Sequence, residues 1–216
     1  MRGSLNNRQT GHMPIDESWL PPRDVVTVEG PDAVAYVHSQ VTQDIATLPV
    51  GEARWTFVLD PTGKIVSLAR VRRTADARLE LDTDRGYGDA LLARLNRFRI
   101  RVKAELALEV GEQHPDFDDA ARVAAGWPRL GAEIVPGETL VAGTGLSGLA
   151  VCFTKGCYPG QELVERMDSR GADAPRRLCR VPAGTDDPAV QITSTAGPHA
   201  LAWVPRGSAI GEPVEF

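Results

Sequence analysis

The chain has 216 residues, of which 42% are hydrophobic and 25% are charged, and its formal net charge is −5. This length can bury a core in one large or two small domains, and the acidic balance excludes a protein that coats nucleic acid through general charge. Met1–Gly11 is polar and lacks the apolar core of a signal peptide. No stretch is long and apolar enough to cross a bilayer. We therefore expect a cytoplasmic protein with no membrane partner and no direct nucleic-acid binding.

The first half of the chain alternates between segments of period two, which predict strands, and segments of helical spacing. Pro31 suits the first turn of a helix. Asp60-Pro61-Thr62-Gly63 is typical of a hairpin turn and lacks the spacing and the following helix of a phosphate-binding loop. The expected elements are strands at 23–29, 54–59, 64–72, 78–81 and 99–108 and helices at 31–40 and 86–98.

Two of these strands predict how the sheet is buried. In 54–59, Trp55, Phe57 and Leu59 share one face, which predicts a half-buried strand. In 99–108, Ile100 and the alternate residues that follow form an apolar face. Because the helices return to one face of a largely antiparallel sheet, this half predicts an α+β domain.

The second half of the chain is richer in loops. An acidic stretch at 111–119 is the best linker candidate, and the later segments predict a short strand at 151–153 and a helix at 161–167. Short strands follow at 178–181, 190–195 and 200–204. We expect a disordered leader at 1–22, an N-terminal domain at 23–110, a linker and shortened middle region at 111–175, and a small C-terminal β region at 176–216.

The segment with the most distinctive chemistry is the octapeptide Lys155-Gly156-Cys157-Tyr158-Pro159-Gly160-Gln161-Glu162. A nearby cation and a helix start both stabilise a thiolate, so Lys155 and the helix that follows favour a reactive Cys157. Gly156 and Gly160 allow close approach of the backbone to a ligand. Glu162 can accept two N–H groups of a heterocycle, and Gln161 offers a donor and an acceptor.

A purely structural interpretation of the octapeptide stays open. In this interpretation the octapeptide is a tight turn with glycines at its corners, and its cysteine is simply buried. Free cysteines are among the most buried residues. The other cysteines, Cys152 and Cys179, do not form a second close pair, and the four histidines are scattered. Structural zinc sites and iron–sulfur clusters usually take four ligands, often in close pairs, so we expect reduced thiols and no metal site.

The octapeptide resembles the Lys-Gly-Cys-Tyr-x-Gly-Gln-Glu signature of the folate-binding YgfZ family, relatives of the glycine-cleavage T-protein. Weaker resemblances occur in the same order along the chain as in the family. They are Val41–Asp44, Leu59–Ile65, Ala125–Gly131, Ile192–Ser194 and Ala200–Val204.

The resemblance implies a T-protein-like fold, with a ferredoxin-like N-terminal domain and a small, abbreviated C-terminal β-barrel-like region. It implies tetrahydrofolate or a derivative as cofactor, iron–sulfur client proteins as partners, and a role in maintaining iron–sulfur enzymes, including those that modify tRNA. The resemblance further implies that Cys157, as the signature cysteine, is central to this maintenance role. The implied folate-binding residues are Lys155, Gly156, Tyr158, Gly160, Gln161 and Glu162.

Two alternatives remain beside this accessory role. The first is an aminomethyltransferase that moves a one-carbon unit to tetrahydrofolate, although Ala124 stands where the resemblance implies a pterin-binding glutamate. The second is a non-enzymatic, degenerate scaffold, which the short middle region favours.

Overall fold

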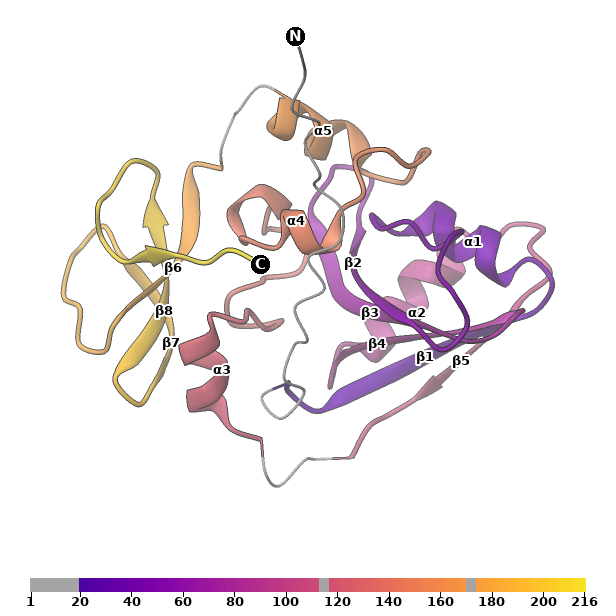
Figure 1. Ribbon diagram of the computed structural model, residues 1–216, viewed down its shortest axis with the longest axis horizontal. Helices are drawn as coiled ribbons and strands as arrows, with labels where there is room; N and C mark the ends of the chain where they lie inside the picture. Colours follow the sequence, from indigo (N-terminus) through magenta and orange to yellow (C-terminus); the bar gives the residue numbers. More distant parts are fainter. Residues whose placement is uncertain (1–19, 113–116, 170–173) are drawn as a thin grey trace, which may run out of the picture.

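The computed structural model of the protein describes residues 20–112, 117–169 and 174–216. The leader expected at 1–22 lies almost entirely outside them. The described residues form a five-stranded sheet and a four-stranded sheet, both antiparallel. A middle segment of loops and short helices lies between the sheets (Figure 1). The α+β class predicted from the sequence is confirmed.

The five-stranded sheet has the strand order β2-β3-β4-β1-β5. Its chain order, β1-α1-β2-β3-β4-α2-β5, has one strand more than the β-α-β-β-α-β order of ferredoxin-like domains. The elements are β1 (Arg23–Glu29), α1 (Ala33–Gln40), β2 (Ala53–Leu59), β3 (Ile65–Ala75), β4 (Arg78–Asp84), α2 (Gly88–Arg97) and β5 (Glu105–Glu109).

Both helices cover one face of this sheet, as their order in the sequence predicted. α1 contributes Val37 to the shared core, and α2 contributes Leu91 and Leu95. Val26 and Val28 of β1 face them, because alternate residues of a strand share a face. These five side chains are fully buried.

The other face of the sheet is also covered, which makes the prediction of a half-buried β2 wrong. Trp55, Phe57 and Leu59 pack into a second core with Trp127 of the middle segment. Val58, on the opposite face of β2, belongs to the core under the helices. The alternation in β2 therefore separates two cores, because the middle segment covers the face that would otherwise meet solvent.

The strand predicted at 99–108 is wrong in its first half, since β5 begins only at Glu105. Arg101 has a φ of 57°, which ends any extended run, and Ile100 is 76% exposed. The partner strand β1 ends at Glu29, opposite Glu105, so residues before Glu105 have no strand to pair with.

Where the structure describes it, the middle segment contains three short α-helices and one 3-10 turn. They are α3 (Asp119–Ala125), η2 (Val141–Gly143), α4 (Ser147–Ala150) and α5 (Gln161–Ser169). Sequence reasoning missed α3, whose start is marked by the Asp118 carboxylate accepting from the backbone N–H groups of Ala120 and Ala121. The strand expected at 151–153 is instead a loop that follows α4.

The C-terminal sheet is open, so the barrel-like region expected there is wrong. Its strand order is β7-β8-β6-β9, which leaves β7 and β9 at opposite edges. A barrel needs its edge strands to pair, and β9 has only two residues, both paired with β6. The strands are β6 (Arg176–Pro182), β7 (Gln191–Ala196), β8 (His199–Pro205) and β9 (Glu212–Pro213).

A buried ion pair attaches this second sheet to the middle segment. The Arg122 guanidinium of α3 lies 3.0 Å from the Glu133 carboxylate, and both side chains are fully buried. Arg122 also donates to the Ser194 hydroxyl of β7, and that hydroxyl donates to Glu133. Because a buried charge is costly without its partner, this network fixes where β7 lies against α3.

Two glycines lock the β2–β3 hairpin against the loop that precedes α5. Gly63 and Gly160 have φ values of +88° and +84°. A Cβ on Gly63 would lie 2.7 Å from the Leu163 Cβ, and one on Gly160 would lie 2.6 Å from the Asp60 carbonyl oxygen. Only glycine fits both the backbone conformation and the space, so the hairpin tip sets the position of the octapeptide.

The Gly160→Ala substitution tests this contact, with Gly51→Ala as a matched control. Gly51 has a φ of +90° and nothing within 4 Å of an added Cβ, so its substitution should cost only the conformational strain, roughly 1–2 kcal/mol. Gly160→Ala should lower the free energy of unfolding by about a further 1–3 kcal/mol, the usual cost of overpacking. Urea unfolding measures both, and equal losses would show that the two segments do not interlock.

Candidate functional site

The octapeptide presents one thiol and buries its neighbour. We call Lys155–Gly160 the thiol loop. Cys157 is exposed, whereas Cys179 is buried in β6 and Cys152 is partly buried. Tyr158, directly after Cys157, is 7% exposed and belongs to the core that covers the second face of the sheet. The loop is therefore anchored in the core at the residue next to its exposed thiol.

Lys155 ties the thiol loop to the end of α1. Its ammonium donates to the carbonyl oxygens of His38, Val41 and Gln43, at 2.6 Å for Val41 and 3.2 Å for Gln43. It also lies 5.2 Å from the centroid of the Tyr158 ring. Cations are favoured at the carbonyl end of a helix, so Lys155 holds the loop in place through backbone groups that are distant in the sequence.

Burial shifts the pKa values of Lys155 and of the neighbouring His38. It lowers the pKa of Lys155 to about 8, an effect that the nearby Asp44 carboxylate opposes. The pKa of His38 is also lowered, first by burial and then by the Lys155 ammonium.

The remaining predicted site residues divide into exposed and internally bonded groups. Gly156 and Glu162 are exposed, with Glu162 in the first turn of α5. The Gln161 amide oxygen accepts from the Tyr158 backbone N–H at 3.3 Å, and its amide nitrogen donates to Glu165. Gln161 therefore stabilises the loop through hydrogen bonds within the protein. Its neighbour Glu162 is exposed to solvent.

The Tyr158 hydroxyl has an unusual environment. Its oxygen is buried and has no hydrogen-bond partner among the described residues. Burial also raises the pKa of this phenol above its ordinary value. Leaving such a group unpaired costs about 1–3 kcal/mol. The apolar packing of the Tyr158 ring in the core must offset this cost.

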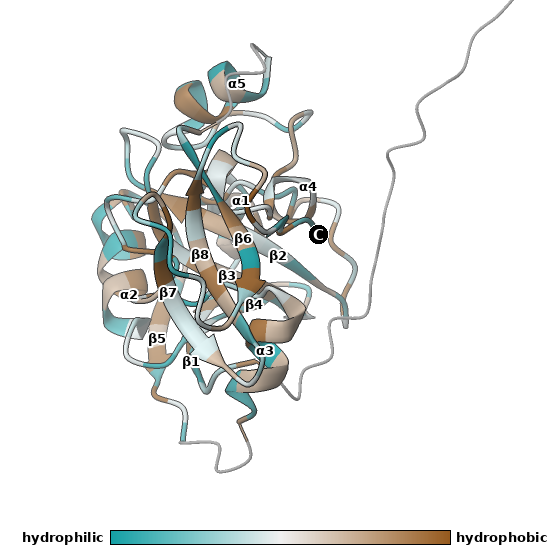
Figure 2. Ribbon diagram, turned by 90° about the vertical axis from the view of Figure 1, so that its left-hand side faces the viewer, coloured by the Kyte–Doolittle hydropathy of each residue, from teal (hydrophilic) through white to brown (hydrophobic). Residues whose placement is uncertain are grey.

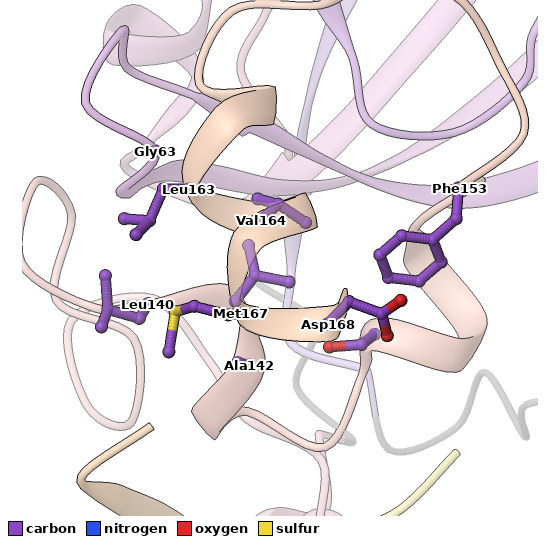
Figure 3. A pocket seen from close by; sticks show the side chains of 10 residues that line it. Gly63, Leu140, Ala142, Phe153, Leu163, Val164, Met167 and Asp168 are labelled. Atoms are coloured by element: carbon purple, nitrogen blue, oxygen red, sulfur yellow. The ribbon is translucent and has the colours of Figure 1, made fainter. Parts of the chain in front are cut away.

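An apolar cavity of about 180 Å³ lies beside the thiol loop. Figure 3 shows Leu140, Leu163 and Met167 at one end and Phe153 and Asp168 at the other. Phe153 precedes the thiol loop in the sequence and Leu163 follows it. The residues on either side of the loop therefore line this cavity. α5, which supplies much of the wall, lies at one end of the molecule and carries both hydrophobic and hydrophilic residues (Figure 2).

A second cavity, of about 420 Å³, lies between the middle segment and the C-terminal sheet. We call it the cationic cavity because Arg176, Arg177 and Arg206 line it. Ala142 lines both cavities. Both cavities therefore border η2.

Sequence reasoning missed Phe153, Met167 and Asp168 as candidate site residues. The spacing of Leu163, Val164 and Met167 on α5 was the available signal, because residues three and four apart share a helix face. The sequence also has a run of basic residues between Arg94 and Lys103, a pattern that usually indicates a solvated surface. The structure departs from that pattern at its first residue. Arg94 is buried and donates to the Leu59 carbonyl at 2.9 Å.

The described residues offer neither a cluster of metal ligands nor a helix suited to a bilayer. Within residues 20–112, 117–169 and 174–216, no group of three or more His, Cys, Asp or Glu side chains could hold a metal ion. No helix in the same residues is long and apolar enough to span a membrane.

The lowered pKa of Lys155 predicts a pH dependence of stability. Between pH 8 and 10.5, Lys155 is neutral in the folded protein and charged in the unfolded chain, so the unfolded state binds more protons. Its contribution to stability must then rise with pH across this interval. Unfolding by urea at several pH values should show this rise in the native protein and in Lys103→Met, an exposed control, and lose it in Lys155→Met. The same pH profile for all three proteins would contradict the assignment.

Comparison with known proteins finds distant similarities. No protein-family model matches the sequence. An uncharacterized protein of Haemophilus influenzae is 25% identical over 189 aligned residues, covering 69% of this chain and 67% of the relative. The tRNA-modifying protein YgfZ of Serratia proteamaculans is 23% identical over 258 aligned residues, covering 85% of this chain and 78% of the relative.

The structural comparison concerns the fold alone. The glycine cleavage system aminomethyltransferase T of Bartonella henselae superimposes with a TM-score of 0.70 at 18% identity, covering 90% of this chain and 83% of the other. The chain is thus a distant relative of the YgfZ tRNA-modifying proteins and has the fold of a glycine-cleavage aminomethyltransferase.

Proposed function

We propose that the protein is a tetrahydrofolate-binding accessory protein of the YgfZ type. It would support the maintenance or repair of iron–sulfur enzymes, including those that modify tRNA, with Cys157 as its reactive or ligand-contacting thiol. The distant similarity to tRNA-modifying YgfZ proteins supports the class of function.

The observation that carries the proposal is the contrast between Cys157 and its neighbours. Lys155 is held by three carbonyls and Tyr158 is buried, yet Cys157 between them is exposed. A cysteine that only packs would be buried, as Cys179 is. A rigid loop with an outward thiol is suited to presenting that thiol to a ligand or a client protein.

The apolar cavity is the candidate site for the ring end of a folate. A cavity of about 150 Å³ accepts benzene, so one of about 180 Å³ can take one edge of the two fused rings of a pterin and leaves the rest of the ligand outside. The Asp168 carboxylate, at one end, can accept N–H groups of an aminopyrimidine. Phe153 is 39% exposed and offers a face for stacking.

Tetrahydrofolate, when bound, would supply a carrier for a one-carbon unit. The residues that would hold its ring are Phe153, Leu163, Met167 and Asp168, and Ser147 adds a hydroxyl at the cavity wall. The unpartnered Tyr158 hydroxyl is a further polar group in the same core, at the base of the thiol loop. The chain itself therefore contributes binding, orientation and a nearby thiol.

Aminomethyl transfer to tetrahydrofolate is the alternative favoured by the structural neighbour, although 18% identity supports the fold alone. Turnover of a lipoyl-bound aminomethyl group would separate this enzyme activity from the accessory role. A degenerate scaffold would show neither that turnover nor folate binding.

The Cys157→Ser substitution tests the accessory role, with Cys152→Ser as a matched control in the same segment. Cys157→Ser should change the free energy of unfolding by less than about 0.5 kcal/mol, because the side chain is exposed. It should nevertheless abolish complementation in a bacterial strain that lacks its own YgfZ-type protein, read out as the activity of a tRNA-modifying iron–sulfur enzyme. Cys152→Ser should complement.

Calorimetric titration with tetrahydrofolate under anaerobic, reducing conditions completes the test. We expect saturable binding with a Kd on the order of micromolar, about −8 kcal/mol. Full complementation by Cys157→Ser would overturn the thiol role. A folded protein that binds no tetrahydrofolate would overturn the folate role.

A further inference from the structure

The turn that follows α1 is closed by the side chain of His38, which lies in the last turn of that helix. We call residues 41–47 the post-helix turn. The Nδ1 atom of His38 accepts hydrogen bonds from the backbone N–H groups of Ile45 and Ala46, at 3.1 and 3.2 Å. A ring nitrogen that accepts a hydrogen bond carries no proton, so the imidazole is neutral in this arrangement.

The same turn positions the thiol loop. The Lys155 ammonium donates to the backbone carbonyls on either side of Thr42 and to the carbonyl of His38. The Thr42 carbonyl accepts from the backbone N–H of Cys152, at 3.0 Å. The conformation of the post-helix turn therefore decides whether these acceptors converge on Lys155 and on the segment that leads into the thiol loop.

Charged groups from several segments act on the imidazole. Burial lowers the pKa of His38 below its ordinary value of 6.5, and the Lys155 ammonium acts in the same direction. Asp44 opposes them, with its Oδ1 atom 3.3 Å from Nδ1 of His38. Arg54 of β2 lies 3.9 Å from the other oxygen of that carboxylate. Among the described residues, the charges around this imidazole thus come from the turn itself, from β2 and from the thiol loop.

Protonation of the imidazole would break this arrangement. A proton on Nδ1 makes that atom a donor, so the N–H groups of Ile45 and Ala46 lose their acceptor. It also places a second cation beside the Lys155 ammonium, and like charges repel. The Asp44 carboxylate can pair with the new proton, but it already accepts from the Ala46 N–H at 3.0 Å and from the Thr47 hydroxyl at 2.6 Å. The turn therefore has a different set of hydrogen bonds in each protonation state.

We propose that His38 is a pH-sensitive switch for the thiol loop. Neutral His38 keeps the post-helix turn closed and its carbonyls directed at Lys155. Protonated His38 opens the turn, weakens the bonds to Lys155 and loosens the loop that carries Cys157. The effect on activity rests on the proposed function, whereas the switch itself rests on the contacts of His38.

Proton linkage gives the direction and the limit of the effect. The pKa of His38 is lower in the closed turn than in an open one, where it returns toward 6.5. The open state therefore binds more protons, and its population rises as the pH falls below 6.5. Between about pH 7 and about pH 5.5, the rise is at most about tenfold. Lys155 stays protonated over this interval, because its pKa is about 8.

Amide hydrogen exchange measured by NMR tests the switch in the native protein. The amides of Ile45 and Ala46 report on the turn, and the amide of Cys152 reports on the segment that leads into the thiol loop. Protection factors, which correct for the intrinsic pH dependence of exchange, should fall about threefold to tenfold at all three amides between about pH 7 and about pH 5.5. A titration of the imidazole resonances should give His38 a pKa below 6.5.

Three variants separate the switch from general acid sensitivity. His38→Asn keeps an acceptor close to the position of Nδ1 but does not titrate in this range, so its protection factors should not depend on pH. His38→Ala removes the acceptor and should lower protection at both pH values. His199→Asn, in β8 of the C-terminal sheet, is the matched control and should keep the native pH dependence.

Two outcomes would overturn the inference. One is the same pH dependence in His38→Asn as in the native protein. The other is a pH-dependent protection of Ile45 and Ala46 without any change at Cys152, since the turn would then open without loosening the thiol loop. None of these measurements uses folate. A loop that is insensitive to pH would leave the proposed function standing, and a failure of folate binding would leave the switch standing.

Discussion

The structure depends on covering the second face of the five-stranded sheet. Helices α1 and α2 cover one face, but Trp55, Phe57 and Leu59 make the other equally apolar. A segment with little regular structure covers it, centred on Trp127, whose ring centroid lies 4.5 Å from that of Trp55. Burying large aromatic side chains contributes more than any single polar contact in the region. This requirement brings the middle of the chain, and the thiol loop within it, against the N-terminal sheet.

The thiol loop is consequently rigid at both ends and open in the middle. Tyr158 is part of the core that covers the second face, and Lys155 is bonded to carbonyls at the end of α1. Gly160 lies against the β2–β3 hairpin at a distance that admits no side chain. These contacts fix the backbone on either side of Cys157 while leaving its sulfur exposed. Pre-organisation of this kind reduces the conformational entropy lost when a partner binds.

Sequence patterns predicted the elements whose burial is periodic, and they failed where tertiary contacts decide. The β2–β3 hairpin follows from alternating side chains and the turn residues of Asp60–Gly63, and α5 begins at Gln161 as its sequence predicted. The run from Arg99 alternates just as well, but β1 ends before it can pair there, and Arg101 turns the chain.

In the candidate site too, local patterns predicted some features, and tertiary contacts decided the others. Cys157 and its glycines were identifiable from the octapeptide, because two glycines, a proline and a cysteine rarely share a core strand. The role of Lys155 could not be predicted, since its acceptors lie more than a hundred residues away. The two cavities depend on η2, α5 and β6 meeting in space, which no local pattern encodes.

A crystal structure of the protein soaked with 5-formyltetrahydrofolate, a stable folate, would test the account most directly. The account predicts density for the ring between Phe153, Leu163 and Met167. Cys157 should remain exposed beside it. Density at another place on the molecule, or an apolar cavity without ligand at a concentration that saturates binding in solution, would contradict the account.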